Sequence, residues 1–264
     1  MLNNVALNNE TNIIPFEVIK GKQKKEIKYK KDGTVKKTKN NRVSGESTEV
    51  YAFKSKEEIA SMVGVFDKHI AEATNEEKKW IAHRNKLLFL VGINIGIRAS
   101  DLRTLRWSFF FDQDKEGKIK FKPFYTLQPM KQRKQKKFVK LYFNQVVQTA
   151  IRNYISEYPV ENLDDYLFRS REGDKPLTVQ GLWNVIKGAA DEVGIEQNIG
   201  SHSLRKTFGY HIWHQAEDKN KALVILQQIF NHSSTQTTAK YIGILDEEIE
   251  DTFNSIELGL EMIM

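Results

Sequence analysis

The sequence predicts an α+β fold that is mainly helical, with a small antiparallel β-sheet and a flexible basic N-terminal segment. Apolar residues recur at helical spacing over most of the chain from residue 54 onward. The stretch 107–143 is instead rich in aromatic and β-branched residues, which favour strands. Residues 1–50 hold many Lys and Asn and few apolar residues after Ile19, so they cannot build a core alone.

We take residues 1–50 as a basic arm that precedes the folded part of the chain. Between positions 20 and 42 there are eleven Lys or Arg against two acidic residues. Asp32 and Gly33, flanked by strand-forming residues, predict a β-hairpin on a two-residue turn. Because an isolated hairpin is only marginally stable in water, we expect this arm to be mobile until it meets a partner.

The folded part begins with two helices. Ser55 and Glu58 have the spacing of a capping box, which predicts the start of the first helix. The apolar pattern of the second helix covers 80–95, and Gly96 is placed to end it.

The middle of the chain changes from helix-forming to strand-forming. A short helix is expected over 100–106, with Ser100 or Asp101 as its N-cap. Three strands of one small antiparallel sheet should follow, the last two joined by 130–136. Their ranges are 107–111, 118–127 and 137–143.

Helical patterns return in the second half of the chain. We take residues 51–245 as one domain and 246–264 as an acidic, amphipathic helical tail. The five helices expected within the domain cover 144–158, 178–193, 202–215, 220–230 and 235–242.

Composition excludes several classes of protein. Apolar residues make up 40% and charged residues 28%, as in ordinary globular proteins. The longest apolar stretch, 87–97, is too short to cross a bilayer, and the first residues lack a signal-peptide pattern, so we expect a cytoplasmic protein without a membrane partner. With no cysteine, disulfides, thiolate metal sites and cysteine nucleophiles are excluded.

The charge distribution favours a polyanionic partner. The net charge is +7, and the run 131–140 holds six basic residues in ten. Lysine runs are often no more than solvated surface, but two dense runs together with an acidic C-terminal end favour nucleic acid.

Three separate motifs supply side chains suited to a phosphate group. They are Gly96-Ile-Arg98-Ala-Ser-Asp101-Leu, Ser201-His202-Ser-Leu-Arg205 and Asn231-His232-Ser-Ser followed by Tyr241. The planar fork of arginine stays charged and holds two phosphate oxygens at once. Arg98 and Arg205 both fall at expected helix starts, where free backbone N–H groups also favour anions. Each residue alone has a duller structural explanation; their joint occurrence points to a site for phosphoryl chemistry beside a phenol.

In order and spacing these motifs resemble the boxes of the tyrosine recombinases, the family of phage integrases and related DNA strand exchangers. The second motif resembles the family's His-x-Leu-Arg box. The third resembles its Leu-Gly-His-x-x…Tyr element, with Phe230-Asn231 in place of Leu-Gly. The resemblance covers roughly 51–241 and implies a site-specific recombinase that cuts and rejoins double-stranded DNA without metal or other cofactor.

The resemblance also implies a role for each residue. Tyr241 would attack the phosphate and form a 3′-phosphotyrosyl link, while Arg98 and Arg205 hold its non-bridging oxygens. His202 would handle the tyrosine proton or a phosphate oxygen, and His232 would supply a further hydrogen bond. Asp101 would hold Arg98 in position without itself contacting the phosphate.

A lysine on a turn between two strands would protonate the leaving 5′ oxygen in this family. Lys131 is the better match, and Lys134 stays open because the turn is one residue longer than the common pattern. Other basic residues are expected to contact DNA: Arg133, Lys134, Lys136, Lys137 and Lys206, and in the arm Lys28, Lys30, Lys31, Lys36 and Lys37.

Assembly and alternatives follow from the same comparison. The family implies a homo-tetramer on DNA, joined through the tail 246–264, with accessory DNA-bending proteins as further candidate partners. The arm does not resemble the family's separate helical domain, which puts autonomous recognition of a DNA site in doubt.

The rival hypotheses are a DNA-binding regulator with this fold that does not exchange strands, and a type IB topoisomerase. His211 and His214 lack a third ligand at a recognisable spacing, so no metal site is expected.

Overall fold

The computed structural model describes residues 50–115, 118–131, 138–244, 249 and 253–255, all of which belong to the unit Glu49–Met264. Except for residue 50, the expected arm and its hairpin lie outside the described residues. So do 132–137 of the basic run and most of the tail 246–264.

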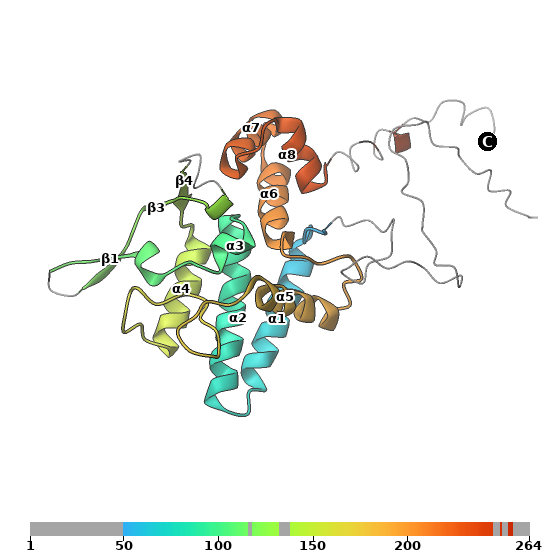
Figure 1. Cartoon of the computed structure of the whole chain (residues 1–264). Coiled ribbons are helices and arrows are strands. Elements are labelled where there is room, and N and C mark those ends of the chain that lie inside the picture. Colours follow the sequence, from blue (N-terminus) through green and yellow to red (C-terminus); the bar gives the residue numbers. More distant parts are fainter. Residues whose placement is uncertain (1–49, 116–117, 132–137, 245–248, 250–252, 256–264) are drawn as a thin grey trace, which may run out of the picture. The chain divides into compact units, whose positions relative to one another are not determined.

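Two antiparallel helices open the described part (Figure 1). Helix α1, Lys56–Ala71, starts at the predicted capping box: Ser55 accepts from the backbone N–H of Glu58, and the Glu58 carboxylate accepts from the backbone N–H of Ser55. Helix α2, Glu76–Ile95, ends at Gly96, which has a φ of 67°. Glycine adopts this left-handed conformation without steric cost, so the predicted end of the helix is confirmed.

The helices of the second half agree with the expected ranges to within about two residues. Each begins with a side chain that accepts from the helix backbone, except α6. Their bounds are α4, Gln145–Glu157; α5, Val179–Glu192; α6, Ser203–Gln215; α7, Lys219–Phe230; and α8, Thr235–Ile242.

The strand region differs from the expected single sheet. Strand β1, Phe111–Gln113, pairs with β2, Ile119–Phe121, and β3, Phe124–Leu127, pairs with β4, Val139–Tyr142. Both pairs are antiparallel, but they form two separate ribbons among the described residues. Pro123 offers a reason, because a residue without an N–H cannot continue a ladder and so divides the expected strand 118–127.

Two further expectations were wrong in this region. Trp107–Phe109 form a short 3₁₀ helix (η1) instead of a strand. Helix α3 covers only Ala99–Leu102 and has Arg98 as its N-cap, without a side-chain cap. Neither Ser100 nor Asp101 is the N-cap that the sequence predicted; the Asp101 carboxylate accepts instead from the backbone N–H of Met130, at 2.8 Å.

Close packing of α2 against α6 brings distant motifs together. Gly92 of α2 lies so near Leu204 of α6 that an added Cβ would be 2.5 Å from the Leu204 Cδ1 atom. The end of α2 therefore meets the start of α6, which carries Arg205. A second, smaller core cluster joins α6, α7 and α8, and Phe230 is fully buried in it.

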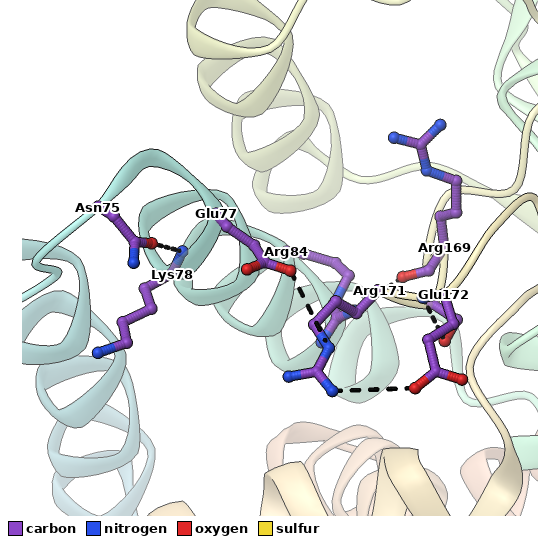
Figure 2. Close-up of polar contacts among 8 residues, drawn as sticks. Asn75, Glu77, Lys78, Arg84, Arg169, Arg171 and Glu172 are labelled. Carbon is purple, nitrogen blue, oxygen red and sulfur yellow. Dashed lines mark hydrogen bonds and ion pairs between the residues drawn. The ribbon is translucent and has the colours of Figure 1, made fainter.

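Arginines also fasten the loop after residue 168 to α2 (Figure 2). Arg84 is buried and donates from Nη1 to the carbonyl oxygen of Arg169 at 2.7 Å. Arg171 Nε lies 4.0 Å from the carboxylate of Glu77 in the first turn of α2. Burial lowers the pKa of Arg84 to about 10, so it remains charged at neutral pH.

In the part of the chain that is described, no helix is both long and apolar enough to span a membrane.

Candidate active site

Arg205 lies at the centre of the candidate site, in the first turn of α6. Its side chain is buried, with 4% of the residue exposed. Nη1 donates to the carbonyl oxygen of Gly96 at 2.8 Å, and Nη2 donates to that of Phe230 at 3.0 Å. The guanidinium carbon also lies 4.1 Å from the centre of the Phe230 ring. Two neutral carbonyls and one ring face hold the cation, so its charge is available to an anion.

The electrostatics of Arg205 are also consistent with a positive charge that can bind an anion. Burial lowers its pKa to about 10, still far above neutral pH. Among the described residues, no carboxylate lies within 4.0 Å of its nitrogens. Asp101 acts on this guanidinium only from beyond ion-pair distance, so Arg205 can still gain from a bound phosphate group.

Tyr241 presents its hydroxyl to this arginine from α8. The hydroxyl oxygen lies 3.0 Å from Nδ1 of His202. The pKa of Tyr241 is raised, because burial outweighs the charges of Arg205 and Arg98 and a hydrogen bond with Arg205, which lower it. If the tyrosine oxygen accepts from Arg205, its own proton is directed to His202. The phenol is thus placed between a cation that favours its ionised form and an imidazole that can take its proton.

His202 is held in its neutral form. Burial lowers its pKa, and the charges of Arg205, Lys131 and Arg98 lower it further. A neutral imidazole can accept a proton at Nδ1, as a base beside Tyr241 must.

His232 is also neutral, and its tautomer follows from its neighbours. Burial together with Arg205 and Arg98 lowers its pKa to about 4. Its Nδ1 lies 3.1 Å from the hydroxyl of Thr238, which itself donates to the carbonyl oxygen of Ser234 at 3.2 Å. Because that hydroxyl has only one proton, Nδ1 of His232 is the donor of the pair.

Arg98 and Lys131 lie close enough to the site for their charges to act on His202. Arg98, half-buried, lines one small cleft together with Arg205 and Asp101. Asp101 is 2% exposed, and its hydrogen bond to Met130 fixes the connection that carries Lys131. The Asp101 carboxylate therefore contacts the backbone next to Lys131, whereas the family resemblance implied a contact with Arg98.

The DNA-binding residues proposed from the sequence are only partly described. Lys206 was expected to contact DNA, but only 7% of it is exposed, and its Nζ lies 5.8 Å from the centre of the Tyr241 ring. The arm lysines and residues 132–137, with Arg133, Lys134, Lys136 and Lys137, lie outside the described residues. The choice between Lys131 and Lys134 therefore stays open.

Phe230 is the site residue that the sequence reasoning missed. Its ring contacts Arg205, and its centre lies 5.4 Å from that of His232 and 5.5 Å from that of Tyr241. The sequence signal was its position directly before the third motif, where the resembling family has leucine.

Within the described ranges, no group of three or more His, Cys, Asp or Glu side chains is placed to hold an ion. His211 instead contacts the carbonyl oxygen of Phe53 at 2.9 Å.

A mainly helical domain that gathers two arginines, two histidines and a tyrosine defines the class of tyrosine recombinase catalytic domains. Residues 66–248 match the family model of the phage integrase family, and the chain belongs to that family.

Individual relatives agree with this assignment. The chain is 33% identical over 181 residues to the "Probable integrase/recombinase YoeC" of Bacillus subtilis (strain 168), a match that covers 67% of this chain and 88% of that protein. It is 31% identical over 110 residues to the "Tyrosine recombinase XerD" of Oceanobacillus iheyensis, covering 40% of this chain but only 35% of XerD.

Solved structures show the same fold. The XerA recombinase superposes with a TM-score of 0.54 and 18% identity, over 79% of this chain and 65% of XerA. The XerH recombinase bound to palindromic difH substrate gives a TM-score of 0.54 and 17% identity, over 85% of this chain and 60% of XerH. The chain thus spans less than two thirds of these recombinases.

Proposed function

We propose that this protein is a site-specific recombinase that cuts and rejoins duplex DNA through a covalent link to Tyr241. One observation carries the proposal: the Tyr241 hydroxyl lies 3.0 Å from His202 Nδ1, beside the buried guanidinium of Arg205. Nucleophile, base and oxyanion partner are the groups that in-line attack on a phosphodiester requires.

The proposed reaction balances without a further reactant. The Tyr241 oxygen attacks the phosphorus, its proton passes to His202, and a new P–O bond to tyrosine forms. The bond to the 5′ oxygen breaks, and Lys131 or Lys134 protonates this leaving group. Arg98 and Arg205 hold the non-bridging oxygens. Because the phosphotyrosyl ester keeps the energy of the broken bond, rejoining needs neither ATP nor metal.

We assign His232 a hydrogen bond to the phosphate from Nε2. In the described geometry its proton sits on Nδ1, so Nε2 becomes a donor only after the tautomer changes. The hydroxyl of Thr238 can permit this by rotating away from Ser234 to donate to Nδ1. Thr238 would thus set the tautomer of His232.

The proposed assembly is taken from the sequence. The arm 1–50 would contact DNA, residues 51–245 would form the catalytic domain, and the tail 246–264 would dock on a neighbouring protomer in a homo-tetramer on DNA. Accessory DNA-bending proteins stay candidate partners, and the cytoplasm stays the expected compartment. The solved relative XerH, which is bound to its difH substrate, supports DNA as the partner.

A nicked suicide substrate tests the chemistry, because loss of the short leaving fragment traps the covalent complex. The unaltered protein should give an adduct that survives SDS, and Tyr241→Phe should bind DNA but give none. Tyr158→Phe is the matched control, since the Tyr158 hydroxyl is buried without a hydrogen-bond partner among the described residues. Sequence-specific binding with no adduct from any suicide substrate would instead support the regulator.

A further inference from the structure

The β3–β4 ribbon has one face in the core and one in solvent. Side chains alternate along a strand, so Leu127 and Leu141, at 8% and 4% exposure, face inward. The opposite face, called the outer face below, consists of Phe124, Thr126, Phe138, Lys140 and Tyr142, all of which are exposed. The outward face of such a ribbon is usually polar, whereas three of these five residues are aromatic.

The aromatic residues of the outer face are neighbours. Phe124 and Tyr142 are paired across the strands, with ring centres 5.9 Å apart. Lys140 lies two residues before Tyr142, and its Nζ is 4.7 Å from the centre of the Phe124 ring. Phe138 continues the row and is 60% exposed, and Tyr142 is 65% exposed. A strip of rings around one ammonium group is thus open to solvent.

The surrounding sequence favours an anionic occupant. From residue 118 to residue 143 there is no Asp or Glu, whereas nine residues are Lys or Arg. Their positions are Lys118, Lys120, Lys122, Lys131, Arg133, Lys134, Lys136, Lys137 and Lys140. An uninterrupted basic segment with interleaved aromatic residues complements a nucleic acid far better than another basic protein surface.

The rings also indicate the form of that nucleic acid. In a duplex, the faces of the bases are covered by their neighbours, so an exposed aromatic ring gains little from them. In an unpaired strand the base faces are free and stack on aromatic side chains, whereas cations follow the backbone. The ribbon also ends beside the candidate site, because its connection carries Lys131, whose charge acts on His202.

We infer that the outer face of the β3–β4 ribbon binds unpaired DNA next to the site of cleavage, with Phe138 and Tyr142 stacking on bases and Lys140 contacting the backbone. The source of such strands rests on the proposed function, since exchanging strands requires that cut ends leave one duplex before they join another. The binding itself can be measured without cleavage.

The test compares the unaltered protein with the double variant Phe138→Thr/Tyr142→Thr. Threonine keeps a good strand propensity, and both positions are largely exposed, so the ribbon should persist. The probes are a short fluorescein-labelled oligothymidine and a labelled duplex, followed by anisotropy. Losing one base–aromatic stack weakens binding about 5-fold to 150-fold, so the double variant should lose at least about 10-fold for oligothymidine. Its affinity for the duplex should change by less than about 2-fold.

Two further variants separate stacking from charge. Lys140→Gln should weaken binding to both probes and reduce the salt slope for oligothymidine by about 0.7. Val224→Thr replaces an apolar residue on α7 that is 47% exposed and lies outside the outer face, and it should change neither affinity.

Three results would overturn the inference: unchanged oligothymidine binding by the double variant, an equal loss for both probes, or a loss of self-association of the double variant in sedimentation with oligothymidine binding retained. The last result would identify the face as a protein interface. The proposed function fails separately: the unaltered protein would then form no adduct on the suicide substrate, whatever its binding to oligothymidine.

Discussion

A single methyl group at Gly96 would test how Arg205 is held. Gly96 has a φ of 67°, and an added Cβ would lie 2.1 Å from Cδ1 of Phe208. The left-handed conformation costs a non-glycine residue about 1–2 kcal/mol, and overpacking of this kind costs about 1–3 kcal/mol. Gly96→Ala should therefore lower the free energy of unfolding by about 2–5 kcal/mol.

The same change should impair cleavage, because the Gly96 carbonyl accepts a hydrogen bond from Arg205 at 2.8 Å. Moving Phe208 and this carbonyl would displace the guanidinium. Loss of one such transition-state donor costs about 100-fold to 1,000-fold in rate. The assays are urea unfolding followed by tryptophan fluorescence, and single-turnover adduct formation at a temperature where the variant is folded.

Gly64→Ala is the control, since nothing lies within 4 Å of a Cβ there and the position is inside α1. It should stabilise the protein by about 0.5–1 kcal/mol and leave cleavage unchanged. The reasoning would be refuted if Gly96→Ala had the same free energy of unfolding as the unaltered protein. It would also be refuted if the folded variant formed the adduct at the normal rate.

Two further predictions concern charge in the site. The pKa of His232 is lowered from 6.5 to about 4 in the folded protein, so the unfolded chain binds the proton first as the pH falls. The stabilising contribution of neutral His232 should therefore be complete above pH 6.5 and decline towards pH 4. Urea midpoints measured over that range should fall less steeply for His232→Asn than for the unaltered protein. Arg205→Lys keeps the charge but has no planar fork to reach the carbonyls of both Gly96 and Phe230, so the rate of adduct formation should fall about 100-fold or more. Duplex binding by the same variant should change by less than about 3-fold. An adduct rate near that of the unaltered protein would contradict the view that these two carbonyls position the arginine.

The helices were predictable because their signals are local. A capping box at Ser55 and Glu58, a stop at Gly96 and N-caps at Asn144 and Thr178 each act within one turn of their own residue. Such signals depend little on what the helix packs against.

The strands were harder because pairing is not local. The alternation of side chains is the same in one sheet and in two ribbons, so the sequence could not decide between them. Pro123 was the available clue to the division. The 3₁₀ turn at Trp107–Phe109 has aromatic residues like a strand, and only tertiary packing distinguishes it.

The residues of the candidate site could be named from their motifs, but the groups that hold those residues in position could not be predicted. Arg205 is held by two backbone carbonyls, at Gly96 and Phe230, which lie 109 and 25 residues away. Every residue offers a carbonyl, so no residue type marks these acceptors in a sequence. The tautomer of His232 likewise depends on the position of Thr238 in the fold.

Mapping the trapped covalent complex tests the central claim most directly. After digestion by protease and nuclease, mass spectrometry should find the nucleotide on the peptide that contains Tyr241, and the released DNA strand should carry a 5′ hydroxyl that a kinase can label. A nucleotide on any other residue, or a released 5′ phosphate, would contradict the proposed chemistry.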